Sequence, residues 1–261
     1  MFDITGIIVT YRSDVSDVEA AAKSFLNTPL GVCLLVVDND SGAAYLERLT
    51  ELVGDKARVI PSGKNGGFGF GNNVGIKYAP PSRYLLFLNP DVVVHEGTLH
   101  TLVSYMDAHP DVGMVSPKVL SSDGSLQPLN KRNPTVLDLF LRRFAPGCIR
   151  RLPRVQQRLD RYAMMDVGYD APCEVEFITG CFMLVRREVL EKVGGFDEDF
   201  FMYLEDADLT RRIHREARTM YLPDATITHR WQRGSHRSFR LMLVMFHSIW
   251  VYFNKWGWVW R

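Results

Sequence analysis

The chain has 261 residues, of which 46% are hydrophobic and 23% charged, and its formal net charge is +1. That composition is ordinary for a globular protein with a substantial core, and the balanced charge argues against nucleic acid as a main partner. None of the four cysteines forms a C-x-x-C pair, the N-terminus does not resemble a secretory signal, and no apolar run reaches the about 20 residues that span a bilayer. A cytosolic protein with reduced cysteines is therefore expected.

Short apolar runs alternate with helix-like stretches in the first half of the chain. Strands are expected at Ile4–Thr10, Val32–Val37, Arg58–Ile60 and Tyr84–Leu88, and helices at Val15–Leu26, Ala43–Val53, Gly71–Ala79 and Glu96–Ala108. Near-continuous apolar strands between helices are typical of a parallel sheet that is covered on both faces. The sequence therefore predicts an α/β fold.

The second half is less regular. Residues Lys131–Tyr169 are rich in Arg and Pro, and we expect a mobile loop or a small helical excursion there. Regular structure is expected again at Val175–Val185, followed by a helix at Glu205–Ala217 and by strands at Thr219–Leu222 and Ala225–Thr228.

Polar side chains follow three of the expected strands, at Thr10-Tyr11, Asp38-Asn39 and Asn89-Pro90-Asp91. Ligands of parallel sheets bind beyond the carboxyl ends of the strands, so these three clusters define a candidate site. Asp91 could bind a divalent cation that also coordinates phosphate oxygens, although Asn-Pro-Asp taken alone is equally typical of a turn.

Two further segments could contribute to the same site. Asp38 could accept hydrogen bonds from a ribose or a pyrimidine base, or it could cap a helix, and the two roles are compatible. The glycine-rich run from Asn65 to Asn73 permits positive φ angles and close approach of the backbone to a ligand, with helix amides behind it that could bind an anion. Its spacing does not match a dinucleotide fingerprint, and the chain has no P-loop motif.

Acidic residues open the helix expected at Glu205. Asp206 could act as a general base if a reacting hydroxyl lies nearby, while carboxylates at a helix N-terminus are also favoured by the helix dipole alone. The aromatic residues just before them, including Tyr203, could line an acceptor site or belong to the core. His229 follows the last expected strand and could be structural or could complete a metal shell with Asp91.

Together these segments resemble a family 2 glycosyltransferase of the GT-A fold, and in particular the bacterial rhamnosyltransferases that build O-antigen or related cell-wall polysaccharides. The matching blocks run in family order over about residues 4–235, and are Ile7–Tyr11, Val36–Asn39, Asn65–Gly69, Phe87–Asp91, Thr179–Arg186, Gly194–Glu198 and Phe201–Leu209.

The resemblance implies a mostly parallel central sheet in a Rossmann-like, nucleotide-sugar-binding half at residues 1–117. A smaller, mixed, acceptor-binding half at 118–235 would complete a GT-A domain of residues 1–235. Residues 236–261 would form an amphipathic, helical C-terminal tail.

The resemblance also implies an activity. The protein would be an inverting, nucleotide-sugar-dependent hexosyltransferase that moves L-rhamnose from dTDP-rhamnose to a hydroxyl of a glycan, free or linked to polyprenyl diphosphate, in lipopolysaccharide (O-antigen) biosynthesis. A UDP-hexose transferase of the same fold and a non-catalytic carbohydrate- or lipid-binding relative are the alternatives.

Residue roles follow from the matching positions. Asp206 would be the catalytic base, and Asp91 with His229 would hold Mg²⁺ or Mn²⁺. The donor nucleotide sugar would be bound by Thr10, Tyr11, Arg12, Asp38, Asn39, Asn65, Gly67, Phe68, Asn72, Asn89, Asp91 and Gly180. Tyr203, Glu205 and Trp231 would contact the acceptor. Asn89 stands where the broader family often has an aspartate, which leaves one carboxylate fewer for the metal.

The last segment, Phe239–Arg261, interleaves four tryptophans with basic residues. That pattern suits the headgroup boundary of an anionic membrane, which would make the protein peripheral at the inner face of the plasma membrane. A C-terminal helix that packs on the core or on another subunit is the alternative.

Overall fold

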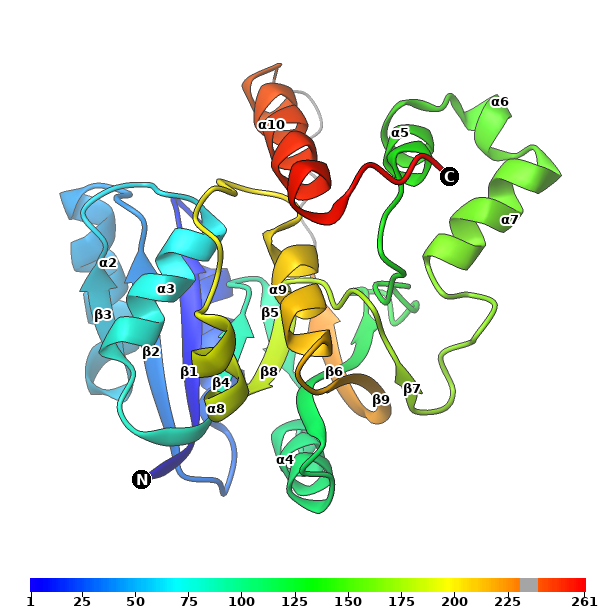
Figure 1. Ribbon diagram of the computed structural model, residues 1–261. Helices are drawn as coiled ribbons and strands as arrows, with labels where there is room; N and C mark the ends of the chain where they lie inside the picture. Colours follow the sequence, from blue (N-terminus) through cyan, green and yellow to red (C-terminus); the bar gives the residue numbers. More distant parts are fainter. Residues whose placement is uncertain (231–238) are drawn as a thin grey trace.

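The computed structural model describes residues 1–230 and 239–261, which form one nine-stranded sheet with helices on both faces (Figure 1). The first half of the sheet is parallel, in the order β3-β2-β1-β4. Its strands are β1 (Phe2–Thr10), β2 (Val32–Asp38), β3 (Arg58–Pro61) and β4 (Ser82–Leu88). The predicted α/β fold is thus confirmed, with parallel strands in its first half.

The other half of the sheet is mixed. Strand β8 (Phe182–Arg186) runs antiparallel to both β4 and β6 (Val112–Leu120). Strand β9 (Arg218–His229) is parallel to β6, and the short strands β5 (Val92–Val94) and β7 (Cys173–Glu174) pair with it antiparallel. The predicted boundary between the two halves, at residues 117 and 118, lies inside strand β6. A single sheet therefore runs through both halves.

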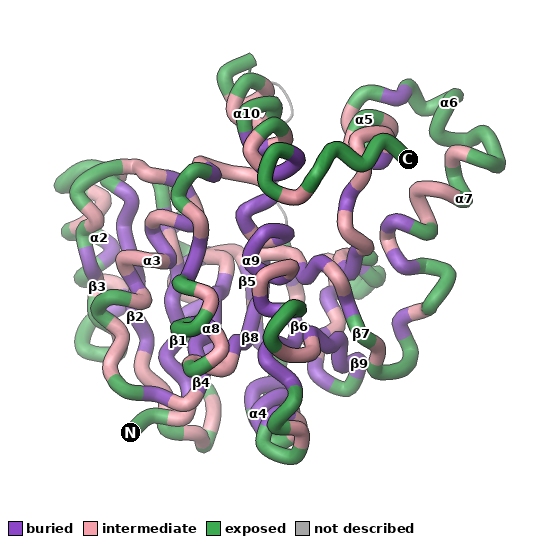
Figure 2. Tube along the Cα trace, viewed as in Figure 1, coloured by how far each residue is buried: buried purple, intermediate pink, exposed green. Residues whose placement is uncertain are grey.

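Helices cover both faces of this sheet because its strands are apolar on both sides. One face packs on α1 (Val15–Leu26), α2 (Ala43–Val53) and α4 (Thr98–Ala108). The other face packs on α3 (Phe68–Tyr78), α8 (Arg187–Val193) and α9 (Glu205–His214). A short 3₁₀ helix, η1 (Gly54–Lys56), follows α2. The strands are the most deeply buried part of the chain (Figure 2).

Further helices lie beyond the sheet, at the top and upper right of Figure 1: α5 (Val136–Phe144), α6 (Gly147–Arg150), α7 (Pro153–Tyr162) and α10 (Phe239–Trp256). The segment Lys131–Tyr169 is therefore the helical excursion, one of its two predicted forms. A third apolar cluster joins α10 to the start of α9 through Phe200, Leu204, Tyr252 and Phe253. Within the two described ranges, no helix is long and apolar enough to cross a bilayer.

Several boundaries differ from the expectation. The sequence did not predict β6, because Gly113, Ser116 and Pro117 interrupt its apolar pattern. The two strands expected at 219–222 and 225–228 are one strand with a register shift against β6. Regular structure within Val175–Val185 begins only at Phe182, and the helix predicted to run to Ala217 ends at His214.

Candidate functional site

The ends of three parallel strands meet at one edge of the sheet, as predicted. Thr10 of β1 is paired with Asp38 of β2, and Ile8 is paired with Leu88 of β4. Asn89 follows directly, and its amide donates to the carbonyl of Cys181 at 3.0 Å. The polar residues after β1, β2 and β4 therefore surround a common space.

Ser41 connects the end of β2 to the turn after β1 through hydrogen bonds. Its amide and its hydroxyl donate to the two carboxylate oxygens of Asp38 at 3.0 and 2.5 Å, while its Oγ accepts from the amide of Arg12 at 2.8 Å. Arg12 has a positive φ of 52°, so the chain turns sharply there. The helix-capping alternative for Asp38 is wrong, because the N-cap of α2 is Gly42, without a side-chain hydrogen bond.

The side chain of Thr10 faces a neighbouring phenol rather than open space. Its Oγ1 lies 2.6 Å from the hydroxyl of Tyr45 on α2. Tyr11, in contrast, is exposed, and the guanidinium of Arg12 lies 5.1 Å from the centre of its ring. An exposed aromatic ring and a cation at the strand end are suited to a base and a phosphate. The donor-binding roles of these residues stay predictions.

Asn39 connects the strand ends to the glycine-rich segment. Its Nδ2 donates to the carbonyl of Gly67 at 2.8 Å, and Asn65 Oδ1 accepts from the amide of Gly67 at 3.2 Å. The Oδ1 atoms of Asn39 and Asn72 are buried and have no hydrogen-bond partner among the described residues. A buried acceptor without a donor is costly, so both atoms are suited to contact a ligand.

The glycine-rich run is mostly helical, so most of its glycines do not adopt the positive φ angles that were predicted for it. Helix α3 starts at Phe68, three residues earlier than predicted. A Cβ on Gly71 would lie 2.5 Å from Val9, and one on Gly75 2.4 Å from Ile7. These glycines let the helix pack closely on β1.

Gly67 alone has the predicted backbone role. Its φ is +94°, and a Cβ there would lie 1.8 Å from the carbonyl oxygen of Phe201. That same oxygen accepts from the amide of Phe68 at 3.2 Å. The start of α3 is therefore fixed against the segment that leads into α9.

Asp91 and His229 face each other across the end of the sheet, because β5 pairs Val92 with His229. Asp91 Oδ1 lies 3.4 Å from His229 Nε2. Gln127 lies at the Nδ1 edge of the imidazole, with its Oε1 3.2 Å from Nδ1. The Nε2 of Gln127 also donates to the backbone carbonyl of His229 at 2.8 Å. This orientation makes Nδ1 the protonated nitrogen and leaves a lone pair on Nε2.

Asp206 lies in the first turn of α9, as predicted. Its Oδ2 accepts from the amide of Gly180 at 2.9 Å and its Oδ1 from the amide of Ala207 at 2.9 Å. Since the next carbonyl, that of Cys181, accepts from Asn89, two consecutive residues join Asp206 to the Asn89–Asp91 turn. A Cβ on Gly180 would lie 3.2 Å from the ring of Phe68 and 3.4 Å from the Cβ of Asp206, so this position is closely packed.

Residues 5–194 match the family described as glycosyl transferase family 2. The chain belongs to glycosyltransferase family 2.

Three relatives are similar over much of this glycosyltransferase. A low-salt glycan biosynthesis hexosyltransferase of Haloferax volcanii is 28% identical over 82% of the chain and 62% of its own length. An N-acetylglucosaminyl-diphospho-decaprenol L-rhamnosyltransferase of Mycobacterium tuberculosis is 28% identical over 82% of the chain and 71% of its own length. The rhamnosyltransferase WbbL of Escherichia coli is 30% identical, over 56% of the chain and 54% of its own length.

Solved structures establish the GT-A architecture. GalNAc-T7 with UDP, GalNAc and Mn²⁺ matches with a TM-score of 0.65 and 16% identity, over 89% of this chain and 45% of that one. A mannosyltransferase of Pyrobaculum calidifontis with GDP-Man and Mn²⁺ matches with a TM-score of 0.61 and 17% identity, over 92% of this chain and 62% of that one. The glycosyltransferase fold predicted from the motifs is confirmed.

Asp91 and His229 are two residues that could hold a divalent cation. A carboxylate and an imidazole lone pair would repel each other at 3.4 Å unless a proton or a cation lies between them. Two neighbouring ligands of an octahedral ion are about 3 Å apart, which agrees with the observed distance. Over residues 1–230 and 239–261 no group of three His, Cys, Asp or Glu side chains could hold a metal, so a cation would take its other ligands from donor phosphates and water.

Charges around the glycosyltransferase's candidate base are unusual. Burial raises the pKa of Asp206, and the ammonium of Lys131 opposes that rise. Burial and then the charge of Asp206 raise the pKa of Glu205 well above its ordinary value, and Glu205 Oε2 has no hydrogen-bond partner in the described part of the chain. Burial lowers the pKa of Lys131 to about 7. The pKa of Cys181 is raised to about 12, mainly by burial and also by the negative charges of Asp91 and Asp206. Cys181 therefore lies within the electrostatic influence of both aspartates.

Tyr203 and Glu205, which were predicted to contact the acceptor, lie directly before and at the start of α9. Tyr203 and Leu204 both have positive φ, 76° and 67°. Two consecutive left-handed non-glycine residues are strained, and such strain gathers at functional sites. Glu205 is buried directly after them. Phe68, which was predicted to bind the donor, packs edge-on against Phe196 at 5.7 Å. Trp231 lies outside the described residues.

Three residues of this site were not predicted from the sequence. Gln127 orients His229, Lys131 opposes the charge of Asp206, and Ser41 holds Asp38. Gln127 and Lys131 come from the irregular segment after β6, where no local pattern separates them from exposed polar residues. Ser41 follows Asp38 by three residues, and a hydroxyl at that spacing is a usual turn partner of an aspartate, so this signal was present in the sequence.

Proposed function

We propose that the chain is an inverting glycosyltransferase that moves L-rhamnose from dTDP-rhamnose to a hydroxyl of a glycan carried on polyprenyl diphosphate, in surface-polysaccharide synthesis. The observation that carries the proposal is the Gly180–Cys181 link, which holds the Asp206 carboxylate beside the Asn89–Asp91 turn. The mycobacterial and E. coli relatives are both rhamnosyltransferases, which supports rhamnose as the sugar.

The proposed reaction is one displacement. Asp206 takes the proton of the acceptor hydroxyl while the oxygen attacks the anomeric carbon, and the bond to the diphosphate breaks on the opposite side. The two backbone amides on Asp206 fix its direction. A divalent cation held by Asp91 and His229 would supply positive charge to the departing diphosphate.

Glu205 is assigned to the acceptor. Burial and the neighbouring carboxylate raise the pKa of Glu205 well above its ordinary value, which favours its protonated form. A neutral carboxylic acid can donate a hydrogen bond to a sugar hydroxyl that Asp206 does not deprotonate. The pair would thus hold an acceptor and activate it without two adjacent negative charges.

A UDP-hexose donor is the second candidate. It is favoured by the hexosyltransferase of Haloferax volcanii, which matches as much of the chain as the mycobacterial relative. A non-catalytic binding protein is disfavoured, because it would have no use for Asp206 held by two amides beside Asp91 and His229.

The experiment is a panel of nucleotide sugars with Mn²⁺ or Mg²⁺, scored by released nucleoside diphosphate. We expect release with dTDP-rhamnose and a lipid-linked acceptor. Asp206→Ala should keep nucleotide binding and lose about 10²–10⁴-fold in transfer, and Asp91→Ala should weaken only metal-dependent nucleotide binding. Asp224→Ala, which removes an exposed carboxylate, is the matched control. Near-normal transfer by Asp206→Ala would show that the base is another residue.

A further inference from the structure

One surface of the molecule is formed by α5, α6, the start of α7, α10 and the C-terminal residues 257–261 (Figure 1); we call it the α5–α10 face. Its parts are joined to one another. Phe144 of α5 stacks on Phe246 of α10 at 5.8 Å. The amides of Val136 and Leu137 donate to the carbonyls of Val259 and Trp260 at 2.9 and 3.2 Å. The C-terminal residues therefore bind amides at the start of α5, which an isolated helix would leave unpaired.

Large apolar side chains are exposed across this face. Trp250 is 56% exposed and Trp260 is 65% exposed. The others are Phe140, Phe144, Ile149, Leu152, Leu243 and Phe246. Single exposed apolar residues are ordinary, but a contiguous group from several elements indicates an interaction surface.

The same face is strongly basic. Residues 136–162 contain seven arginines and two aspartates, and residues 239–261 contain three cationic residues and no acid. The two aspartates are already engaged, Asp138 by Arg158 at 2.7 Å and Asp160 by Gln156 at 2.7 Å. Among the described residues no carboxylate lies within ion-pair distance of Arg151, Arg154 or Arg261.

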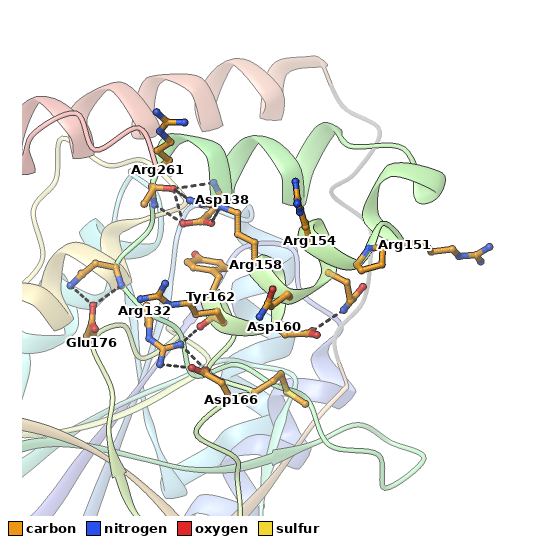
Figure 3. A pocket seen from close by; sticks show the side chains of 17 residues that line it. Arg132, Asp138, Arg151, Arg154, Arg158, Asp160, Tyr162, Asp166, Glu176 and Arg261 are labelled. Atoms are coloured by element: carbon orange, nitrogen blue, oxygen red, sulfur yellow. Dashed lines mark hydrogen bonds and ion pairs between the residues drawn. The ribbon is translucent and has the colours of Figure 1, made fainter.

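A cavity of about 1060 Å³ opens beside these arginines, between α5, α7 and the C-terminus (Figure 3). Six arginines line it, Arg151, Arg154 and Arg261 among them. Four carboxylates line it as well, and each is held by another residue: Asp138 by Arg158, Asp166 by Arg132, Glu176 by Asn133 and Asp160 by Gln156. The cavity is far larger than one phosphate ion, while unpaired guanidinium groups bind phosphate oxygens well. It is suited to several phosphate groups that stand close together, as at the surface of an anionic bilayer.

We infer that the α5–α10 face docks on an anionic lipid bilayer, with lipid phosphates in the arginine-lined cavity and the exposed apolar side chains among the acyl chains. Amphipathic surfaces with basic and aromatic residues bind in this way without crossing the membrane. A second copy of the chain fits less well, since two faces of the same positive charge would repel each other. Nucleic acid fits less well because Leu152, Leu243 and Ile149 offer it no favourable contact.

Docking there would place the candidate base next to the membrane. Ser248 of α10 donates to the carbonyl of Met202 at 2.7 Å, and Trp256 Nε1 donates to Asp208 of α9 at 2.9 Å. Helix α10 thus lies directly over the turn that holds Asp206. This inference concerns lipid binding alone, so it stands or falls separately from the proposed sugar transfer.

The test is sedimentation of the full chain with vesicles of phosphatidylcholine alone or with added phosphatidylglycerol. We expect clear binding only to the anionic vesicles. Arg151→Gln with Arg154→Gln should weaken it about 25-fold, since each arginine near an anionic surface contributes about fivefold, or about 1 kcal/mol. Leu243→Ser with Trp250→Ser should weaken binding that persists in high salt, where charge is screened.

Matched controls are Arg48→Gln with Lys56→Gln, two exposed cations on α2 and η1 at the far side of the molecule. These changes should leave vesicle binding unaltered, and all variants should bind nucleoside diphosphate as the native chain does, which shows that they fold. Equal binding to both vesicle types would overturn the inference. So would unchanged binding by the arginine pair, tighter binding to single-stranded DNA than to vesicles, or a dimer that hides the face.

Discussion

At Asp206 the surroundings decide at which pH the residue can act. Asp206 must be ionised to accept a proton, and burial raises its pKa while Lys131 opposes the rise. Transfer should therefore fall as the pH drops through a value above the ordinary 3.8 of an aspartate. Removing Lys131 removes the charge that favours the ionised form.

Lys131→Met should move this acidic limb of the pH–rate profile to higher pH, because the charge that lowers the pKa of Asp206 is lost. The expected shift follows because the ammonium, with a pKa of about 7, is charged in the range where Asp206 titrates. The measurement is kcat against pH at saturating donor, with the exposed Lys56→Met as control. A lower plateau with an unmoved limb would mean that Lys131 only packs against its neighbours.

We expect Glu205 to lower the free energy of unfolding at neutral pH, because it is buried beside the carboxylate of Asp206. Because its pKa is raised in the folded chain, the native state binds more protons than the unfolded state above about pH 4.5, and the free energy of unfolding falls as the pH rises. Glu205→Gln removes this dependence, so its Tm relative to the native chain should be higher at pH 8 than at pH 4, by roughly 3 °C per kcal/mol. Thermal melts at both pH values test this, with the exposed Glu96→Gln as reference.

Gln127 would act on the proposed metal site through His229, whose imidazole it contacts. Gln127→Leu removes the partner of Nδ1 and of the His229 carbonyl, so the imidazole can rotate or change tautomer. Loss of such a supporting residue costs about 10–100-fold in metal affinity. Titration of nucleoside diphosphate should show weaker binding with Mn²⁺ and unchanged binding without metal. A loss that is equal in both conditions would indicate a folding defect instead.

Contacts between helices and loops position the residues of the candidate site, and the start of α3 is one example. Gly67 carries a positive φ and touches the carbonyl of Phe201, so α3 and the approach to α9 are fixed together. Gly67→Ala should cost about 2 kcal/mol or more and also lower kcat, because Phe201 leads into the turn before Asp206. Urea unfolding and transfer assays measure the two effects.

Gly63→Ala is the matched control for that change. Gly63 also has a positive φ, of 81°, but a Cβ there would meet nothing within 4 Å. The alanine should therefore carry only the backbone strain and leave kcat unaltered. If both variants lost activity equally, the contact with Phe201 would be irrelevant to the site.

The same elements show what the sequence could predict. Strand ends at Thr10, Asp38 and Asn89 could be read directly, because apolar runs fix the strands and parallel pairing fixes their shared edge. The start of α3 could not, since Phe68 is held by Phe201, which is 133 residues away along the chain. The role of Gln127 depends likewise on His229 in a strand whose pairing is set by long-range contacts. Residues whose function comes from distant partners leave no local pattern.

On the scale of the whole molecule, α10 both completes the core and exposes apolar surface, so the two readings of the tail are compatible. Tyr252 is fully buried, and its hydroxyl lies 3.2 Å from Arg211 of α9 and 3.3 Å from Asn133 before α5. Two residues earlier, about half a turn away on the helix, Trp250 is 56% exposed. The helix therefore has a structural face and a free face.

Tyr252→Ala should lower the free energy of unfolding by about 3–5 kcal/mol, the usual cost of removing a large buried ring. Transfer should fall as well, because the same cluster holds Phe200 and Leu204 before the candidate base. Trp250→Ala should change stability by less than about 0.5 kcal/mol while it weakens vesicle binding. Chemical unfolding and vesicle sedimentation of both variants distinguish the buried face of α10 from its exposed face. If Trp250→Ala unfolded the chain as readily as Tyr252→Ala, the exposed face of α10 would belong to the core, and the bilayer would have no apolar surface to bind there.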